Sequence, residues 1–300
     1  MATLTTDIRR VQANGIDFAY LEAGPADGPL ALCLHGFPDH APTWRHLLPE
    51  LAAAGWHAVA PWMRGYHPTG LAPDGQYQLA TLCLDALALL DALGGDERAV
   101  IIGHDWGSLA ACGAGMLEPA RMARLVCMAV PQNALAFQKV ISDWEQMKRS
   151  WYMWFFQLPG IYEMAISGDD CAAVENIWRD WSPGLAIDPE DMSQIRATLS
   201  RPEVFQAAMG YYRNTVDATT QSDELNLAQL TVTSETLGTP VLFVAGADDG
   251  LFVPEAFREG AEYCTAECRV EVLDGCGHFM HQERPAEVNR LILGFIGGAG

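Results

Sequence analysis

The segment AVIIGHDWGSLAA at residues 99–111 constrains the fold of this 300-residue chain more than any other. Its β-branched apolar run at 100–102 is typical of a fully buried strand. Small apolar residues follow the pentapeptide GHDWG (103–107) with the spacing of a packed helix. The glycines at both ends of that pentapeptide leave room for a sharp turn. The sequence therefore predicts a strand, a tight turn and a helix, with Asp105 at the tip of the turn.

A carboxylate at the tip of such a turn suits nucleophilic attack on carbon. Asp105 has an ordinary pKa of ~4, so it is ionised at neutral pH and needs no base before it attacks. Attack on a saturated carbon gives an ester, which water can still cleave, whereas a serine would give an inert ether. The chemistry favoured is thus substitution at an epoxide or alkyl halide carbon. The alternative is structural, because an Asp after a strand is often a helix cap.

Apolar runs that alternate with helical patterns predict a mostly parallel, doubly wound α/β sheet. Asn14-Gly15 lies within an alternating segment at 8–22, which indicates an opening β-hairpin. The other predicted strands cover 30–36, 57–62, 99–102, 124–130, 240–246 and 268–274. The predicted helices outside the middle of the chain cover 44–54, 79–93, 254–263 and 285–296, besides the helix after Asp105.

The middle of the chain has a different character. From about residue 132 to 230 the strand patterns stop, and Trp, Tyr, Phe and Met cluster in helical stretches. We therefore expect a helical cap inserted between the sixth and seventh strands. The predicted domains are a core of residues 1–131 and 231–300 and a cap of residues 132–230.

Charge excludes several classes of partner. The chain has 18 Lys and Arg against 38 Asp and Glu, a formal net charge of −20. Such a surface repels phosphate backbones and anionic lipids, so we expect neither nucleic acid nor a membrane as partner. The first ten residues, MATLTTDIRR, are polar, and no apolar run approaches the ~20 residues of a membrane span. We therefore expect no signal sequence.

The eight cysteines are scattered, and most lie in apolar runs. This distribution is typical of reduced core residues in a cytoplasmic protein, which is the expected location. Cys264, Cys268 and Cys276 lie closer together, but no second cluster at zinc-type spacing accompanies them. We expect no metal and no cofactor.

A second motif follows the predicted strand at 30–36. His35-Gly36-Phe37-Pro38 resembles the oxyanion loop of α/β-hydrolases, in particular the branch of epoxide hydrolases and haloalkane dehalogenases. The pentapeptide around Asp105 likewise resembles the nucleophile elbow of that fold. The resemblance implies an α/β-hydrolase fold and an oxyanion hole made of the backbone N–H groups of Phe37 and Trp106.

The same resemblance implies a triad in the order nucleophile, acid, histidine. GADDG (246–250) follows the seventh strand, and we favour Asp249 as the acid, with Asp248 as the alternative. No carboxylate comes directly after the strand at 124–130, where Asn133 lies nearby instead. His278 follows the last strand and matches the histidine loop. His281 is its rival, and we interpret it as a supporting or surface residue.

Two tyrosines of the predicted cap separate epoxide opening from dehalogenation. Opening an epoxide leaves an alkoxide, which needs a proton donor, whereas a halide leaves unaided. KRSWYMWFFQLPG (148–160) resembles the first cap-tyrosine motif of epoxide hydrolases and places Tyr152 in that role. GYYRNTV (210–216) resembles the second and places Tyr212 there, with Tyr211 less favoured. The whole chain thus resembles an α/β-hydrolase-fold epoxide hydrolase.

The expected substrate is a small apolar epoxide, with water as co-substrate. Phe37, Trp106, Trp151 and Phe155 are the predicted substrate-binding residues, because aromatic side chains line apolar pockets. A haloalkane or haloacid dehalogenase stays an alternative, because Trp106 is also what haloalkane dehalogenases use to hold halide. A non-catalytic receptor with the same fold is the second alternative. We also expect a homodimer as one candidate assembly.

Overall fold

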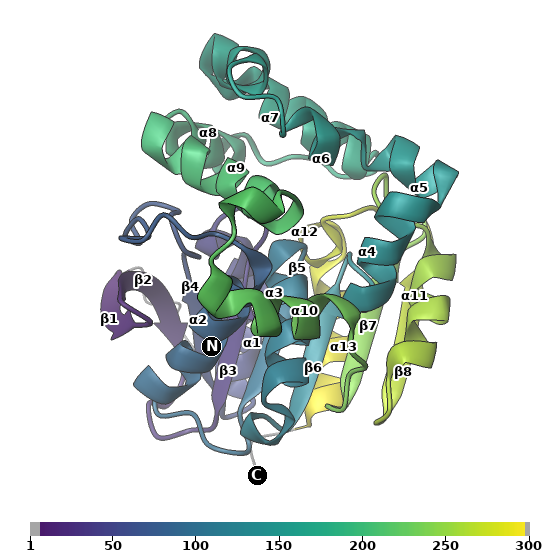
Figure 1. Cartoon of the computed structure of the whole chain (residues 1–300). Helices are drawn as coiled ribbons and strands as arrows, with labels where there is room; N and C mark the ends of the chain where they lie inside the picture. Colours follow the sequence, from purple (N-terminus) through teal and green to yellow (C-terminus); the bar gives the residue numbers. More distant parts are fainter. Residues whose placement is uncertain (1–6, 298–300) are drawn as a thin grey trace.

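The computed structural model describes residues 7–297, in which one eight-stranded sheet has the order β1-β2-β4-β3-β5-β6-β7-β8 (Figure 1). The strands are β1 (Arg9–Ala13), β2 (Ile16–Ala23), β3 (Leu30–Leu34), β4 (His57–Pro61), β5 (Val100–His104), β6 (Arg124–Met128), β7 (Val241–Gly246) and β8 (Cys268–Leu273). β1 pairs with β2, and β2 with β4, in antiparallel fashion, and all later neighbours are parallel. Residues 1–6, most of the polar N-terminal segment, lie outside the described residues.

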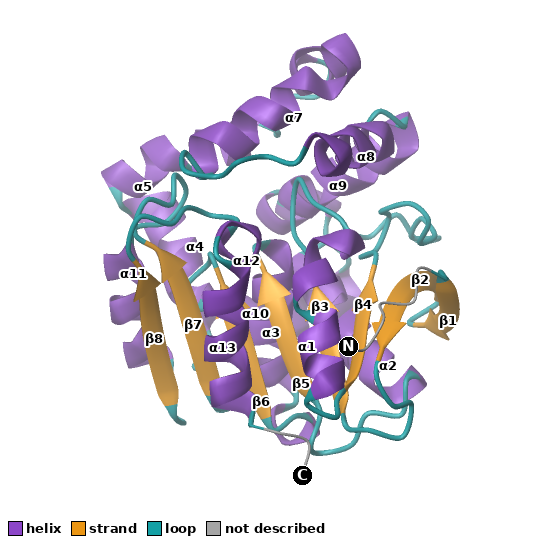
Figure 2. Ribbon diagram, turned by 180° about the vertical axis from the view of Figure 1, so that it is seen from behind, coloured by secondary structure: helices purple, strands orange, loops and turns teal. Residues whose placement is uncertain are grey.

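Helices cover both faces of this sheet. The helices of the described residues are α1 (Leu48–Ala53), α2 (Leu79–Ala92), α3 (Trp106–Leu117), α4 (Asn133–Ser142), α5 (Trp144–Arg149), α6 (Trp151–Phe155), α7 (Gly168–Trp181), α8 (Pro189–Leu199), α9 (Pro202–Val216), α10 (Asn226–Ser234), α11 (Pro254–Gly260), α12 (Met280–Glu283) and α13 (Pro285–Ile296). Shorter 3-10 or π turns cover Ala41–His46, Pro119–Arg121, Glu163–Ser167, Ala218–Thr220, Asp223–Leu225 and Ala261–Tyr263. Helices α2, α3 and α10 lie on one face, and α1 and α13 lie on the other (Figures 1 and 2).

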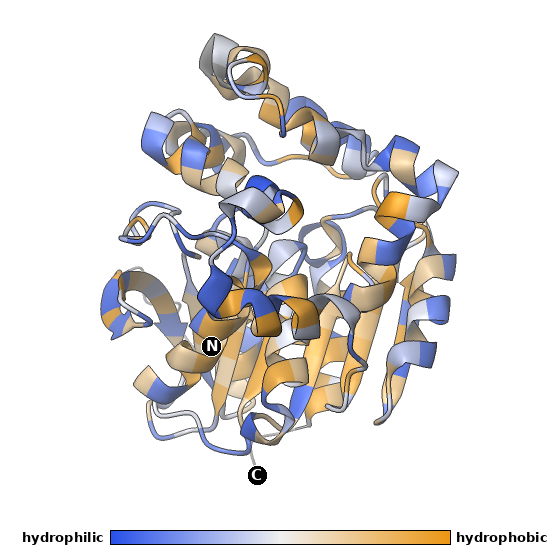
Figure 3. Ribbon diagram, in the orientation of Figure 1, coloured by the Kyte–Doolittle hydropathy of each residue, from blue (hydrophilic) through white to orange (hydrophobic). Residues whose placement is uncertain are grey.

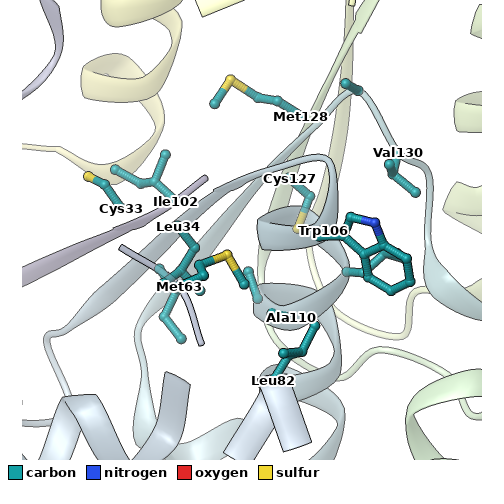
Figure 4. Close-up of a cluster of buried hydrophobic side chains, with 14 of the residues drawn as sticks. Cys33, Leu34, Met63, Leu82, Ile102, Trp106, Ala110, Cys127, Met128 and Val130 are labelled. Carbon is teal, nitrogen blue, oxygen red and sulfur yellow. The ribbon is translucent and has the colours of Figure 1, made fainter. Parts of the chain in front are cut away.

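The central strands are buried along their whole length. Every residue of β3, β4, β5 and β7 is buried, as expected for strands that helices cover on both faces. Figure 3 shows the same contrast, with apolar strands inside and polar helix surfaces outside. Around the start of α3, apolar side chains such as Leu34, Ile102 and Met128 pack together (Figure 4). This packing holds the turn after β5 in a rigid frame.

The predicted fold class, an α/β-hydrolase fold with a mostly parallel sheet, is confirmed. The hairpin turn is also as expected, because Asn14 and Gly15 both have positive φ, 43° and 74°. The predicted helix at 44–54 is wrong in detail: a 3-10 turn ends at His46 and α1 begins at Leu48. Pro49 lies in the first turn of α1, where its missing N–H costs nothing, so a new helix begins there.

Helices α4 to α9 lie between β6 and β7 in the chain, and most of them extend over the carboxyl ends of the parallel strands (Figure 1). Side chains from this segment can therefore reach the loops that follow β3, β5, β7 and β8. The division into core and cap stays a prediction. Its boundary at 230 falls inside α10, which packs against α2 and α3. Within residues 7–297 no helix combines the length and apolar character needed to cross a bilayer.

Candidate active site

Asp105 lies at the turn between β5 and α3, with a backbone φ of 52° and ψ of −117°. Residues other than glycine rarely adopt this backbone conformation, and such backbone strain is typical of functional turns. A Cβ atom at Gly103 would overlap the carbonyl of Gly107, and one at Gly107 would overlap the carbonyl of Leu34. Glycine is therefore required at both positions by close backbone approach. The turn presents the Asp105 carboxylate at the carboxyl edge of the sheet, 4% exposed.

Two backbone N–H groups hold that carboxylate. The N–H of Phe37 donates to Oδ1 of Asp105 over 2.7 Å, and the N–H of Trp106 also bonds to this carboxylate. Phe37 comes from the loop after β3, where a Cβ on Gly36 would collide with the Asp105 side chain. The structure thus brings together the two N–H donors and the carboxylate that the sequence predicts for an oxyanion hole.

A carboxylate and a histidine from two other loops face the nucleophile. Nδ1 of His278, after β8, lies 3.0 Å from Oδ2 and 3.2 Å from Oδ1 of Asp249, after β7. Nε2 of His278 lies 3.8 Å from Oδ2 of Asp105 and has no hydrogen-bond partner within the described residues. Asp248, the alternative acid, is exposed to solvent instead. The geometry therefore selects Asp249 from the two neighbouring aspartates.

Burial and charge set the protonation of these groups. Burial raises the pKa of Asp105 from 3.8 to about 6, although His278 and the N–H groups of Phe37 and Trp106 act to lower it. Burial acts to lower the pKa of His278, but the neighbouring Asp249 and Asp105 outweigh it, so the pKa of His278 is raised from 6.5. At neutral pH the Asp105 carboxylate therefore remains mainly ionised, and the raised pKa makes the His278 imidazole a stronger base than a free one.

Tyr152 of α6 and Tyr212 of α9 line one small cavity together with Asp105 and Trp106. The two tyrosine rings are 5.7 Å apart, and the Tyr212 ring lies 4.9 Å from that of Trp106. Within residues 7–297 no group accepts a hydrogen bond from the Tyr212 hydroxyl. Burial, followed by the charge of Asp105, raises the pKa of both tyrosines well above 10, so both stay protonated. Two protonated tyrosines therefore line the same cavity as the Asp105 carboxylate.

Tyr211 has a different role, because its hydroxyl donates to the carbonyl of Arg64 over 2.7 Å. Asn133 is also structural: its Nδ2 donates to the carbonyls of Leu109 and Val232, each over 3.0 Å. These bonds tie α4 to α3 and α10. Neither side chain lines the cavity beside Asp105.

The cavity has a volume of about 40 Å³, and most of its lining is apolar, with Leu109, Val130, Leu251 and Phe252 among the lining residues. Trp151 and Phe155, predicted to bind substrate, do not line it. They are four residues apart on α6, on a face that points away from the cavity, with ring centroids 5.7 Å apart and Trp151 54% exposed. The aromatic pattern could not distinguish the two faces of so short a helix.

Phe37 and Trp106 remain near the site in different ways. The Trp106 side chain lines the cavity. The Phe37 side chain does not line it, but packs edge-on against Tyr212 with ring centroids 5.5 Å apart. Phe37 therefore contributes its N–H to the nucleophile and its ring to the position of a tyrosine.

One cluster behind the site was not anticipated. Asp39, His104 and His281 are buried and place candidate metal-ligand atoms within 4.8 Å of one another. His104 Nε2 donates to the His278 carbonyl over 2.9 Å, and His281 Nε2 lies 2.6 Å from the Thr43 hydroxyl.

Burial lowers the pKa of His281 to about 3 and that of His104 well below 6.5, so both are neutral. The interpretation of His281 as a surface residue was wrong, because it is 3% exposed. Ligands of a tetrahedral zinc ion lie about 3.3 Å apart, since each bond is ~2.0 Å. The candidate ligand atoms here are separated by up to 4.8 Å, so they would have to move closer together to bind a zinc ion.

The chain belongs to the alpha/beta hydrolase family, whose model matches residues 31–291. It is 30% identical to Epoxide hydrolase A of Mycobacterium tuberculosis (strain ATCC 25618 / H37Rv), over 97% of both chains. It is also 30% identical to Epoxide hydrolase 4 of Mus musculus, over 96% of this chain and 78% of that one. The crystal structure of Epoxide Hydrolase A from Mycobacterium thermoresistibile superimposes with a TM-score of 0.78 at 28% identity, over 98% of each chain. The resemblance found in the motifs is confirmed.

Proposed function

We propose that this protein hydrolyses an apolar epoxide to a vicinal diol through an ester on Asp105. The observation that carries the proposal is the shared cavity, in which a buried carboxylate faces two protonated tyrosines. The relatives named epoxide hydrolases support the same activity. A dehalogenase needs no proton donor for its leaving halide, so two buried O–H donors beside the carboxylate favour epoxide opening.

The first half-reaction follows from the two oxygens of Asp105. Because the Phe37 N–H holds Oδ1, the nucleophile is Oδ2. Oδ2 attacks one epoxide carbon as the bond from that carbon to the epoxide oxygen breaks. The electron pair moves to the oxygen, which takes a proton from Tyr152 or Tyr212. The product of this step is a hydroxyalkyl ester of Asp105.

The second half-reaction uses the free Nε2 of His278. Asp249 orients the imidazole, and Nε2 takes a proton from a water that attacks the Asp105 carboxyl carbon. Charge develops on Oδ1, where the N–H groups of Phe37 and Trp106 stabilise it. The bond from the carboxyl carbon to Oδ2 then breaks and releases the diol. The two protons of water end on the second diol hydroxyl and on the tyrosine that gave its proton.

The test is intact-protein mass spectrometry of a His278→Gln variant soaked with styrene oxide and, separately, with a haloalkane. Loss of His278 blocks ester hydrolysis, so the adduct accumulates. An added mass equal to the whole epoxide supports the proposal, and mapping must place it on Asp105. An adduct from the haloalkane alone, short by one hydrogen halide, would indicate a dehalogenase instead. No adduct from either reagent would count against Asp105 as nucleophile.

The proposal extends to cellular location and assembly. All eight cysteines are free, which supports a reducing cytoplasmic location. Apolar residues at the surface of the segment between β6 and β7, such as Trp144 at 70% and Met164 at 76% exposure, support a homodimer through that segment. Gel filtration with light scattering measures the assembly directly.

A further inference from the structure

An open groove of about 730 Å³ runs along the outside of the molecule beside the active site. Its walls come from α4, α6, the end of α9 and α10. Apolar side chains stand exposed on these walls: Ile141 is 64% exposed, Leu230 60% and Trp154 40%. Contiguous exposed apolar surface of this kind marks a binding site.

The groove and the nucleophile cavity are adjacent. Phe137, Val140 and Met153 line both of them. These three side chains therefore lie between the groove and the space beside Asp105. Met153 is unbranched, with three rotatable side-chain bonds, so this part of the boundary is the most adaptable.

The volumes of the inner cavity and of the groove determine which part of a substrate each space can hold. The inner cavity, about 40 Å³, is far smaller than the ~300–1,000 Å³ of ordinary small-molecule sites. It has room for the epoxide ring and little else. A longer substituent must leave the cavity, and the adjoining groove, about 730 Å³, can receive it.

The charge of the groove restricts what that substituent can be. The chain carries a net charge of −20, yet none of the described side chains that line the groove is charged. The polar lining groups are amides and hydroxyls, such as Gln138, Asn226 and Thr233. An anionic group there would lie in a negative field without a counter-charge, so the groove favours neutral groups.

We propose that this outer groove, at α4, α6, α9 and α10, binds the uncharged tail of the epoxide substrate. The preferred substrate is a terminal epoxide with one long neutral alkyl or aryl-alkyl substituent. Epoxides that end in a carboxylate, such as epoxy fatty acids, are disfavoured. This inference rests on the proposed epoxide hydrolase activity and specifies its substrate class.

The test compares kcat/KM for 1,2-epoxybutane, 1,2-epoxydecane and 9,10-epoxydecanoate. We expect kcat/KM to rise at least about tenfold from the butane to the decane, the effect of burying about two methylene groups. We expect a fall of similar size from 1,2-epoxydecane to the carboxylate of equal length. Equal values for all three substrates would overturn the inference while leaving the proposed hydrolysis intact.

A matched pair of variants locates the effect. Leu230 lines the groove, whereas Leu227, on the same helix and 76% exposed, does not. We expect Leu230→Lys to reduce the discrimination against 9,10-epoxydecanoate to less than about threefold. Leu227→Lys should behave as the parent protein does. Equal effects of the two variants would reject the groove as the tail site.

Two further readouts separate the remaining outcomes. If a second copy of the chain occupies the groove, Leu230→Lys shifts the gel-filtration profile to a smaller species without changing the discrimination, and the inference fails. If no epoxide is turned over and no ester forms on Asp105, the proposed activity itself fails. If the ester forms and the chain-length dependence is absent, only the tail site is rejected.

Discussion

Nε2 of His278 lies 3.8 Å from Oδ2 of Asp105, and neither atom is bonded to the other. Both side chains are almost completely buried, so a direct hydrogen bond would be strong in this environment. The gap instead keeps Nε2 available as a base and Oδ2 available as a nucleophile. In the proposed mechanism the two half-reactions thus use separate atoms of one buried pair.

The acid of the triad can be tested against its neighbour. We expect Asp249→Asn to slow ester hydrolysis about 10²–10⁴-fold, because His278 loses the group that orients and charges it. Asp248→Asn is the matched control and should stay near the parent rate, since Asp248 is exposed. Single-turnover decay of the Asp105 ester gives the rate. A comparable loss in Asp248→Asn would contradict the assignment.

The tyrosines should affect only the opening step. We expect Tyr152→Phe together with Tyr212→Phe to slow ester formation from styrene oxide by at least about 10²-fold, because no O–H remains to protonate the epoxide oxygen. Hydrolysis of preformed ester and the melting temperature should change little.

Tyr211→Phe is the control for this pair, because its hydroxyl bonds to the Arg64 carbonyl away from the cavity. It should lose some stability and keep its rate of ester formation. Diol production at near the parent rate by the double Phe variant would remove both tyrosines from the mechanism.

The rate of ester formation should depend on pH through Asp105. The pKa of Asp105 is raised to about 6, and only the carboxylate attacks. We expect single-turnover ester formation to be constant above about pH 7 and to fall about tenfold per pH unit below about pH 5.5. Rapid-quench measurements across this range give the profile. A profile flat down to pH 4.5 would mean that the nucleophile keeps an ordinary pKa.

Replacing the nucleophile should stabilise the fold. Because the pKa of Asp105 is raised on folding from 3.8 to about 6, the folded protein binds more protons than the unfolded chain between these values, so stability falls as pH rises through that window. The difference corresponds to about 3 kcal/mol above pH 7. We expect Asp105→Asn to recover up to that amount at pH 8 and about half of it at pH 5.

Urea unfolding of Asp105→Asn and the parent protein at both pH values measures this difference. Asp39→Asn is unsuitable as a control, since Asp39 lies close to His281 in the buried cluster. The exposed Asp248→Asn serves better and should leave stability unchanged. A gain for Asp105→Asn that is the same at pH 5 and pH 8 would have to come from packing rather than from charge.

Much of the sheet could be predicted, because buried parallel strands carry continuous apolar runs. The run at 124–130 corresponds to β6, and that at 240–246 to β7, within two residues. Asp105 and Asp249 each follow such a strand, and His278 follows the alternating edge strand β8, so their meeting at the carboxyl edge of the sheet follows from the parallel topology. Short motifs therefore predicted the spatial position of candidate site residues where each motif directly followed a strand.

Features that depend on several distant segments could not be predicted. Asp39 comes from a loop, His104 from the end of β5 and His281 from α12, and only the folded chain shows that their side chains meet. The inward face of α6 is similarly undetermined, because a five-residue helix of mainly aromatic residues has no polar face to mark the outside. The size of the cavity depends on side-chain packing that no local pattern records.

The placement of the tyrosines on α6 and α9, outside the strand-end loops that hold the triad, has an evolutionary consequence. In the proposed mechanism, the segment between β6 and β7 determines which ring is opened and what attached group is tolerated. The loops that hold the triad hydrolyse the resulting ester, and this step does not depend on the group attached to the epoxide. Drift or recombination confined to the segment between β6 and β7 can therefore produce new selectivities while the regeneration of the nucleophile is inherited unchanged.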